Sequence, residues 1–201
     1  MSYIIKNVLE SEITLKSEIW ESIDSIQIDK INWPDKFPAS VNTSAKLIHN
    51  AEGIYVKFTS DEHPVHINYK YHNGEVYEDS TVEFFIAPNK NDINYFNFEI
   101  NAEGYALIGY GSGRERTRFS DIDYSQFKTT SDINENGFEL LLFVPYSFMK
   151  EYASDITKEI KANLQKCCEV PDYTHYLTAY PIESEKPEFH LPQYFKDFIL
   201  E

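Results

Sequence analysis

Apolar and polar residues alternate with a period of two in short segments along most of this 201-residue chain. Successive side chains of a β-strand point to opposite faces, so this pattern is typical of strands that bury one face. The turn-like residues 49–53 separate two such segments and predict a hairpin. We expect strands at residues 25–28, 45–48, 54–58, 65–69, 80–86, 95–101, 105–110, 138–144, 159–164 and 173–179.

About ten short strands at close spacing indicate a single all-β domain over residues 1–201, an antiparallel sandwich or a barrel. Residues 145–152 predict a short helix, since Pro is accepted in a first helical turn, and residues 192–198 predict a second one. Residues 111–120 and 121–136 read as long loops, where binding residues often lie on a β-scaffold.

The charge balance excludes several classes of partner. Lys and Arg number 18 and Asp and Glu number 33, which gives a net charge of −15. Such a chain repels phosphate backbones and anionic bilayers, so we expect neither nucleic acid binding nor membrane insertion. Fifteen Tyr, 14 Phe and two Trp exclude a disordered acidic tail.

Cysteine usage and the N-terminus say little about location. Cys167 and Cys168 are neighbours, a poor arrangement for a framework disulfide or a metal site, so we expect two buried or half-buried thiols. The chain as given shows no signal peptide. The localisation is therefore unknown; the cytoplasm is the default, and an extracytoplasmic location is expected if a leader has been removed.

Two central strands separate a core face from a polar face. Alternation sends Val82, Phe84, Ile86, Phe96, Phe98 and Ile100 to one side, where we expect the core. Glu83, Asn97 and Glu99 point to the other side. Two interpretations of that face stay open, a solvated sheet surface and a ligand site. A solvated surface is the commoner case for such a face, but the mixture of acids, amides and aromatic rings is unusual for one and supports the ligand site.

Six segments of the chain resemble one known family. YEDSTVEFFIAP (77–88), YFNFEINAEG (95–104) and YGSGRERTR (110–118) are similar to segments of carbohydrate-binding module family 9, especially a bacterial family-9-like branch. KANLQKCC (161–168), HYLTAYPI (175–182) and KPEFHLP (186–192) follow in the family's order. The resemblance implies a jelly-roll-like sandwich related to DOMON folds, non-catalytic carbohydrate binding, and a structural calcium in some members.

Sugar chemistry suits the residues of these segments. A pyranose has an apolar face, which stacks on an aromatic ring, and a belt of hydroxyls, which amides, carboxylates and guanidinium groups can bind. The expected ligand is the end of an oligo- or polysaccharide. The candidate carbohydrate-binding residues are Tyr77, Glu83, Tyr95, Asn97, Glu99, Asn101, Arg114, His175 and Tyr180.

The family's two aromatic clamps are only partly matched. The resemblance puts the first clamp near Tyr77 and the second within residues 175–182, where the family-like branch has Trp and this chain has Ala179 followed by Tyr180. Alanine cannot stack, so either Tyr180 takes over or the clamp is lost. The chain's own tryptophans, Trp20 and Trp33, lie near the N-terminus, and we expect Trp20 in the core.

The only three arginines stand at alternate positions, Arg114, Arg116 and Arg118. In an extended segment all three guanidinium groups project from one side. They then either fork onto sugar hydroxyls or offset nearby acids, and both interpretations stay open. Arg114 is the favoured binder because it follows the 111–113 turn and matches the family-like YGxGR.

Other functions have weaker support. Residues 109–113 read GxGxG, which is neither a nucleophile elbow nor a dinucleotide fingerprint, so we expect no enzyme. A protein-interaction module on the same scaffold and a haem-binding DOMON-type domain stay as alternatives. Asp121 and Asp123 lie in a loop that could offer oxygen ligands to calcium, but no spaced calcium loop fixes a metal site.

Overall fold

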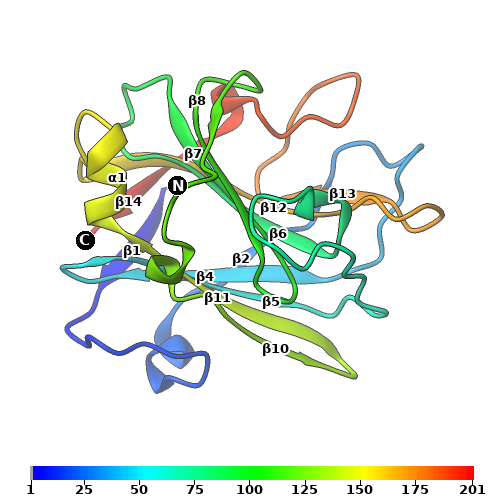
Figure 1. The fold of residues 1–201 in the computed structure, drawn as a ribbon, viewed down its shortest axis with the longest axis horizontal. Coiled ribbons are helices and arrows are strands. Elements are labelled where there is room, and N and C mark those ends of the chain that lie inside the picture. The colour runs from blue at the N-terminus through cyan, green and yellow to red at the C-terminus, as the bar shows by residue number, and fades with distance from the viewer. Residues whose placement is uncertain (1) are drawn as a thin grey trace.

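Residues 2–201 are described by the computed structural model, which consists of fourteen strands in one curled sheet, short 3₁₀ helices and one α-helix (Figure 1). The strands are β1 (Tyr3–Asn7), β2 (Ile26–Gln27), β3 (Lys30–Ile31), β4 (Thr43–His49), β5 (Gly53–Ser60), β6 (Thr81–Ala87), β7 (Tyr95–Asn101), β8 (Ala106–Gly111), β9 (Thr117–Arg118), β10 (Thr130–Asn134), β11 (Gly137–Pro145), β12 (Glu159–Cys168), β13 (His175–Thr178) and β14 (Lys196–Leu200). The α-helix α1 spans Tyr146–Tyr152, and the 3₁₀ helices span Glu18–Ser22, Val76–Glu78, Tyr124–Phe127 and Pro192–Tyr194.

The sheet folds into two facing halves. The first half has the order β10-β11-β5-β4, with β2 beside β4, and the second has the order β12-β6-β7-β8-β9, with β13 and β3 beyond β12. Strands β1 and β14 join the halves: β1 pairs with β4, and β14 pairs with β12. The pairing is antiparallel as predicted, except that β1 runs parallel to both β14 and β4.

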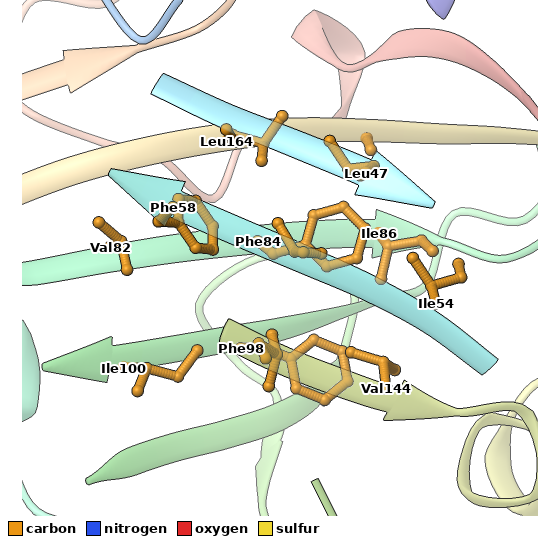
Figure 2. Packing of buried hydrophobic residues seen from close by; sticks show 14 of the residues in the cluster. Leu47, Ile54, Phe58, Val82, Phe84, Ile86, Phe98, Ile100, Val144 and Leu164 are labelled. Carbon is orange, nitrogen blue, oxygen red and sulfur yellow. The ribbon is translucent and has the colours of Figure 1, made fainter. Parts of the chain in front are cut away.

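The core lies between the two halves. Leu47, Ile54, Phe58 and Val144 come from the first half and meet the side chains of β6, β7 and β12 (Figure 2). The sequence-predicted core is confirmed, because these six side chains are fully buried there: Val82, Phe84, Ile86, Phe96, Phe98 and Ile100. A sandwich-like β fold therefore follows from the period-two pattern.

The predicted hairpin is present as β4 and β5. Its turn is closed by the Asn50 side chain, whose Oδ1 accepts hydrogen bonds from the backbone N–H groups of Glu52 at 2.9 Å and Gly53 at 3.2 Å. A Cβ at Gly53 would meet the carbonyl oxygen of Val144 at 2.3 Å. Glycine therefore lets β5 pass close to β11 at this corner.

Three sequence predictions of local structure are wrong. Residues 65–69 form no strand; the backbone N–H groups of His66 and Asn68 donate to side chains of Ser80 and Asp79 instead of a strand ladder. Residues 192–198 form one 3₁₀ turn and then β14, because the tail pairs with β1 and β12. The expected loop 121–136 contains a 3₁₀ helix and β10, which forms a hairpin with β11.

Other expectations from the sequence hold. The helix at 145–152 is present as α1, with Pro145 at its N-cap. Trp20 is buried, and both cysteines are buried free thiols. Within residues 2–201, no helix is long and apolar enough to cross a membrane.

Candidate functional site

A cavity of about 310 Å³ opens on the outer face of the second half, away from the core. Residues far apart in the sequence meet around it, and we call it the arginine cavity because all three arginines line it. The lining residues are Tyr77, Glu83, Glu99, Arg114, Arg116, Arg118, Cys167, Glu169, Tyr176, Pro187, Glu188, Phe189 and His190.

The floor of the arginine cavity belongs to a row of polar side chains that crosses three strands, of which Glu83 and Glu99 line the cavity. Gln165 on β12 is in register with Glu83 on β6, and Glu83 is in register with Glu99 on β7. Since Val82 and Phe84 point to the core, Glu83 must point outward. Both glutamates are only 3% exposed. This polar face is therefore covered by other segments and is not an open solvated surface.

Arg116 lies flat over this floor and holds Glu99. Its guanidinium NH2 donates to Glu99 Oε1 at 2.8 Å, and its Nε donates to Asn97 Oδ1 at 2.6 Å. Asn97 Nδ2 also donates to Glu99 Oε1, at 2.8 Å. A Cβ at Gly109 on β8 would stand 2.7 Å from Asn97 Oδ1 and 3.1 Å from Arg116 Nε. The GYGSGR segment thus needs glycine at 109 so that Arg116 can reach the floor.

Arg114 and Arg118 form the rim. Arg114 pairs with Glu188, and Arg118 NH1 lies 3.2 Å from Glu75 Oε1. The Arg114 side chain is 69% exposed, whereas that of Arg116 is 7% exposed. Ion pairs at exposed positions are weak and can exchange partners. The arginines therefore offset nearby acids, as one of the two interpretations predicted, and the contact with sugar hydroxyls stays a prediction.

Aromatic rings form one wall. Tyr176 and Phe189 meet edge to face with ring centroids 5.9 Å apart, and Trp33 lies behind both. The indole N–H of Trp33 donates to the Ser184 carbonyl at 2.8 Å, which ties down the segment that carries Phe189. Tyr77 also packs against this cluster. The wall offers apolar surface beside charged groups that can form hydrogen bonds.

The ionisable groups of the cavity are strongly affected by burial. Desolvation and the nearby Glu99 raise the pKa of Glu83 well above its usual range. Desolvation also raises the pKa of Glu99, against the opposing effect of Arg116. Desolvation and the three arginines lower the pKa of His190 to about 2, so its ring is neutral. Its Nδ1 lies 2.8 Å from the Tyr95 hydroxyl.

Four of the nine predicted site residues line the arginine cavity: Tyr77, Glu83, Glu99 and Arg114. Two more lie directly behind its lining, since Asn97 holds Arg116 and Glu99, and Tyr95 contacts His190. The outward face of β6 and β7 therefore contributes to the site as the alternation predicted.

The other three predicted residues lie elsewhere. Asn101 is structural: its Oδ1 accepts from the backbone N–H groups of Glu103 and Tyr105, and its Nδ2 donates to the Tyr69 carbonyl at 2.8 Å and to Asp79 Oδ2 at 2.9 Å. His175 is buried, with Nε2 3.6 Å from Glu62 Oε1. Tyr180 packs its ring against Phe198, with centroids 6.0 Å apart. Among the described residues 2–201, these three do not belong to the lining of the arginine cavity.

Within the expected second-clamp segment, 175–182, Tyr176 lines the arginine cavity, whereas Ala179 and Tyr180 do not. Ala179 is buried in the core, so its small size says nothing about stacking in the arginine cavity. Phe189, from the KPEFHLP segment, lines the cavity as well. Residue-by-residue reasoning missed Phe189 and Tyr176, because nothing local shows that these segments fold over β6 and β7. The sequence favours Arg114 as the binder, whereas the structure places Arg116 deeper in the cavity, beside Glu99.

No cluster of three or more His, Cys, Asp or Glu side chains in residues 2–201 could hold a metal ion. Asp123, considered for calcium, is instead the N-cap of a 3₁₀ helix and accepts hydrogen bonds from the Ser125 backbone at 3.0 Å and its hydroxyl at 2.6 Å. The described acidic residues therefore do not fit a calcium site built from side-chain clusters.

Comparisons with known proteins converge on one family. A family model for carbohydrate-binding family 9 matches residues 15–200. The chain is similar to a crystal structure from Bacteroides uniformis ATCC 8492, of a protein provisionally assigned as carbohydrate-binding. That likeness has 26% identity and a TM-score of 0.84 over 100% of this chain and 99% of the other. No curated protein matches the sequence.

Two further solved structures share the fold. Both are family 9 carbohydrate-binding modules from Caldicellulosiruptor kristjanssonii, one in complex with cellotriose and one with glucose. Their TM-scores are 0.68 and 0.66 at 13% and 14% identity, and they cover 100% of this chain and 94% and 96% of theirs.

Proposed function

Because the chain belongs to carbohydrate-binding family 9, we propose that its function, non-catalytic carbohydrate binding, is carried out in the arginine cavity. One observation carries this proposal: buried carboxylates, forked guanidinium groups and an aromatic wall meet in a single cavity on the outer sheet face. A volume of about 310 Å³ is in the range of small-ligand pockets. The proposed partner is a carbohydrate, and the protein acts without catalysis.

The lining suits a sugar in two ways. The apolar face of a pyranose would pack against the wall formed by Tyr77, Tyr176 and Phe189, as aromatic rings pack on apolar surfaces generally. Its hydroxyls would meet Glu83, Glu99 and the arginines, which together offer acceptors and donors. In this proposal Asn97 and Tyr95 act by positioning the groups that touch the sugar.

Isothermal titration calorimetry tests the proposal. We expect binding of cellotriose or glucose, the ligands of the two solved modules, or of another oligosaccharide in a glycan screen. Replacing Phe189 by Ala should weaken binding tenfold or more, because the sugar loses its stacking surface. The control is Leu9→Ala, since Leu9 is 98% exposed and is not one of the residues that line the arginine cavity.

The outcome also separates this function from its alternative. A protein-interaction module would leave the wild type silent against a broad set of oligosaccharides, including acidic ones. Such silence in a folded protein would contradict carbohydrate binding in the arginine cavity. Binding that persists unchanged in Phe189→Ala would place the sugar elsewhere on the molecule.

A further inference from the structure

The hydrogen-bond donors at the floor of the arginine cavity are shared unequally between two carboxyl groups. Glu99 Oε1 accepts from Arg116 NH2 and from Asn97 Nδ2, each at 2.8 Å. Glu83, its neighbour across the strand pair, receives only the Cys167 thiol, with Sγ 3.2 Å from Oε1. Glu83 Oε2 is buried and has no hydrogen-bond partner anywhere in the described chain. The two acids therefore have different environments.

The charged groups around Glu83 also disfavour a negative charge on Glu83 while Glu99 is charged. Glu99 faces it from β7, and Glu169 lies beyond the end of β12. Arg116 is the cation that acts on it, but this guanidinium already donates to Glu99 and Asn97. A second negative charge beside Glu99 would be buried and nearly unpaired, which is costly in a protein interior.

The neighbouring thiol does not supply a countercharge. Burial and the Glu83 carboxyl raise the pKa of Cys167 well above its usual range, so the thiol stays neutral. Its S–H is a weak donor, worth less than an amide or guanidinium hydrogen bond. The pKa of Glu83 is likewise raised, by burial first and by the Glu99 charge second. The hydrogen bonds and the electrostatics thus agree that Glu83 is the carboxyl group that keeps a proton.

We propose that Glu83 meets the sugar as a neutral carboxylic acid that donates a hydrogen bond from its carboxyl group, while Glu99 remains the carboxylate that anchors Arg116. This inference rests on the proposed function, because it assumes that the ligand occupies the arginine cavity. It names the group that the ligand presents to Glu83: an acceptor oxygen, such as a ring oxygen or a hydroxyl, and not the ammonium group of an amino sugar.

The protonation state can be measured without any ligand. In protein labelled with ¹³C, the side-chain carboxyl signals of Glu83 and Glu99 are assigned from the variants Glu83→Gln and Glu99→Gln and followed with pH by NMR. We expect the Glu83 signal to remain that of a protonated acid at pH 7, where Glu99 is ionised. A Glu83 signal that ionises in the usual range of carboxyl groups would overturn the inference, whether or not a sugar binds.

Calorimetry with cellotriose then tests the donor role. Protonated Glu83 binds and ionised Glu83 does not, so wild-type affinity should fall as pH rises through the folded pKa of this group. Glu83→Gln keeps a neutral donor that cannot ionise, so its affinity should not fall at high pH, and at pH 9 it should exceed that of the wild type. Glu83→Ala, which has no donor, should bind at least tenfold more weakly than Glu83→Gln.

The results distinguish two kinds of failure. Binding of Glu83→Gln that is tenfold weaker than wild type at every pH would mean that the sugar needs a charged Glu83, which overturns the inference while leaving the function intact. A wild type that binds no oligosaccharide would contradict the proposed function, and the NMR titration would still decide the protonation state.

Discussion

The two outer faces of the sandwich are built by the same alternation and covered in opposite ways. On the first half, outward residues such as Ile48, Tyr55 and Phe143 are apolar, and residues 8–23 cover them with Trp20 and other apolar side chains. On the second half, outward residues include Glu83, Asn97 and Glu99, and the covering segments leave the arginine cavity. The apolar outer face is therefore sealed by apolar side chains, whereas the charged outer face borders a cavity that a polar ligand could enter.

Hydrogen bonds also hold the covering segment 8–23 on the sheet. Lys46 on β4 donates to the Trp20 carbonyl at 2.6 Å, and Lys57 on β5 donates to the Leu15 carbonyl at 2.9 Å. The Trp20 indole N–H donates back within the segment, to the Thr14 carbonyl at 2.8 Å. The sheet's own lysines therefore satisfy carbonyls of an irregular stretch, which lets that stretch lie against apolar side chains.

The largest expected effect comes from opening the dry face. Trp20→Ala removes a buried ring and leaves a hole over the first half, so it should lower the free energy of unfolding by about 4 kcal/mol. Leu9→Ala, at an exposed position within the same segment, should change it by less than about 0.5 kcal/mol. Urea denaturation measures both. Equal, small losses would show that the segment does not stabilise the fold.

The second test compares two arginines of the cavity. Arg116→Ala leaves the buried Glu99 without its cation, so it should cost about 3 kcal/mol of stability and also weaken sugar binding. Arg114→Ala breaks only an exposed pair, so its cost should be below about 1 kcal/mol. Denaturation of the two variants side by side is the measurement. Similar losses for both would contradict the assignment of floor and rim.

The third test concerns the loss of folding stability at acidic pH. Because the pKa of His190 is lowered to about 2, the folded state holds its ring neutral while the unfolded chain takes up a proton below about pH 6.5. Stability from this group is therefore present above pH 6.5 and lost as pH falls. His190→Gln should keep about 2 kcal/mol that the wild type loses between pH 7 and pH 5. His63→Gln, at an exposed position, is the control. Identical pH profiles for wild type and His190→Gln would contradict this.

The smallest expected effect concerns calcium. The described residues offer no side-chain cluster for a metal, so added Ca²⁺ or a chelator should leave the melting temperature unchanged within error. A ligand that binds only the folded state would raise the melting temperature progressively, because its stabilisation grows with the logarithm of its concentration above Kd. A rise with calcium and a fall with chelator would reveal a site made largely of backbone carbonyls.

Sequence patterns predicted the local parts of this molecule better than the distant ones. Alternation in 80–86 and 95–101 correctly assigned Phe84 and Phe98 to the core and Glu83 to the outer face. The pattern cannot show that Phe189, ninety residues farther along, closes the cavity over that face. The helix predicted at residues 192–198 is wrong for the same reason. Pro192 suggests a helix start, but the tail forms β14 because it pairs with β1 and β12.

The pairing of β1 with β14 has a mechanical consequence. The two strands run parallel, with Tyr3 beside Phe198 and Ile5 beside Leu200. Tension entering through the start of β1 and leaving through the end of β14 would pull them along their length in opposite directions. Hydrogen bonds spaced evenly along a parallel pair then share the load and must break together instead of one at a time. A sugar binder held between two tethers would resist stretching at the seam where its sheet halves join.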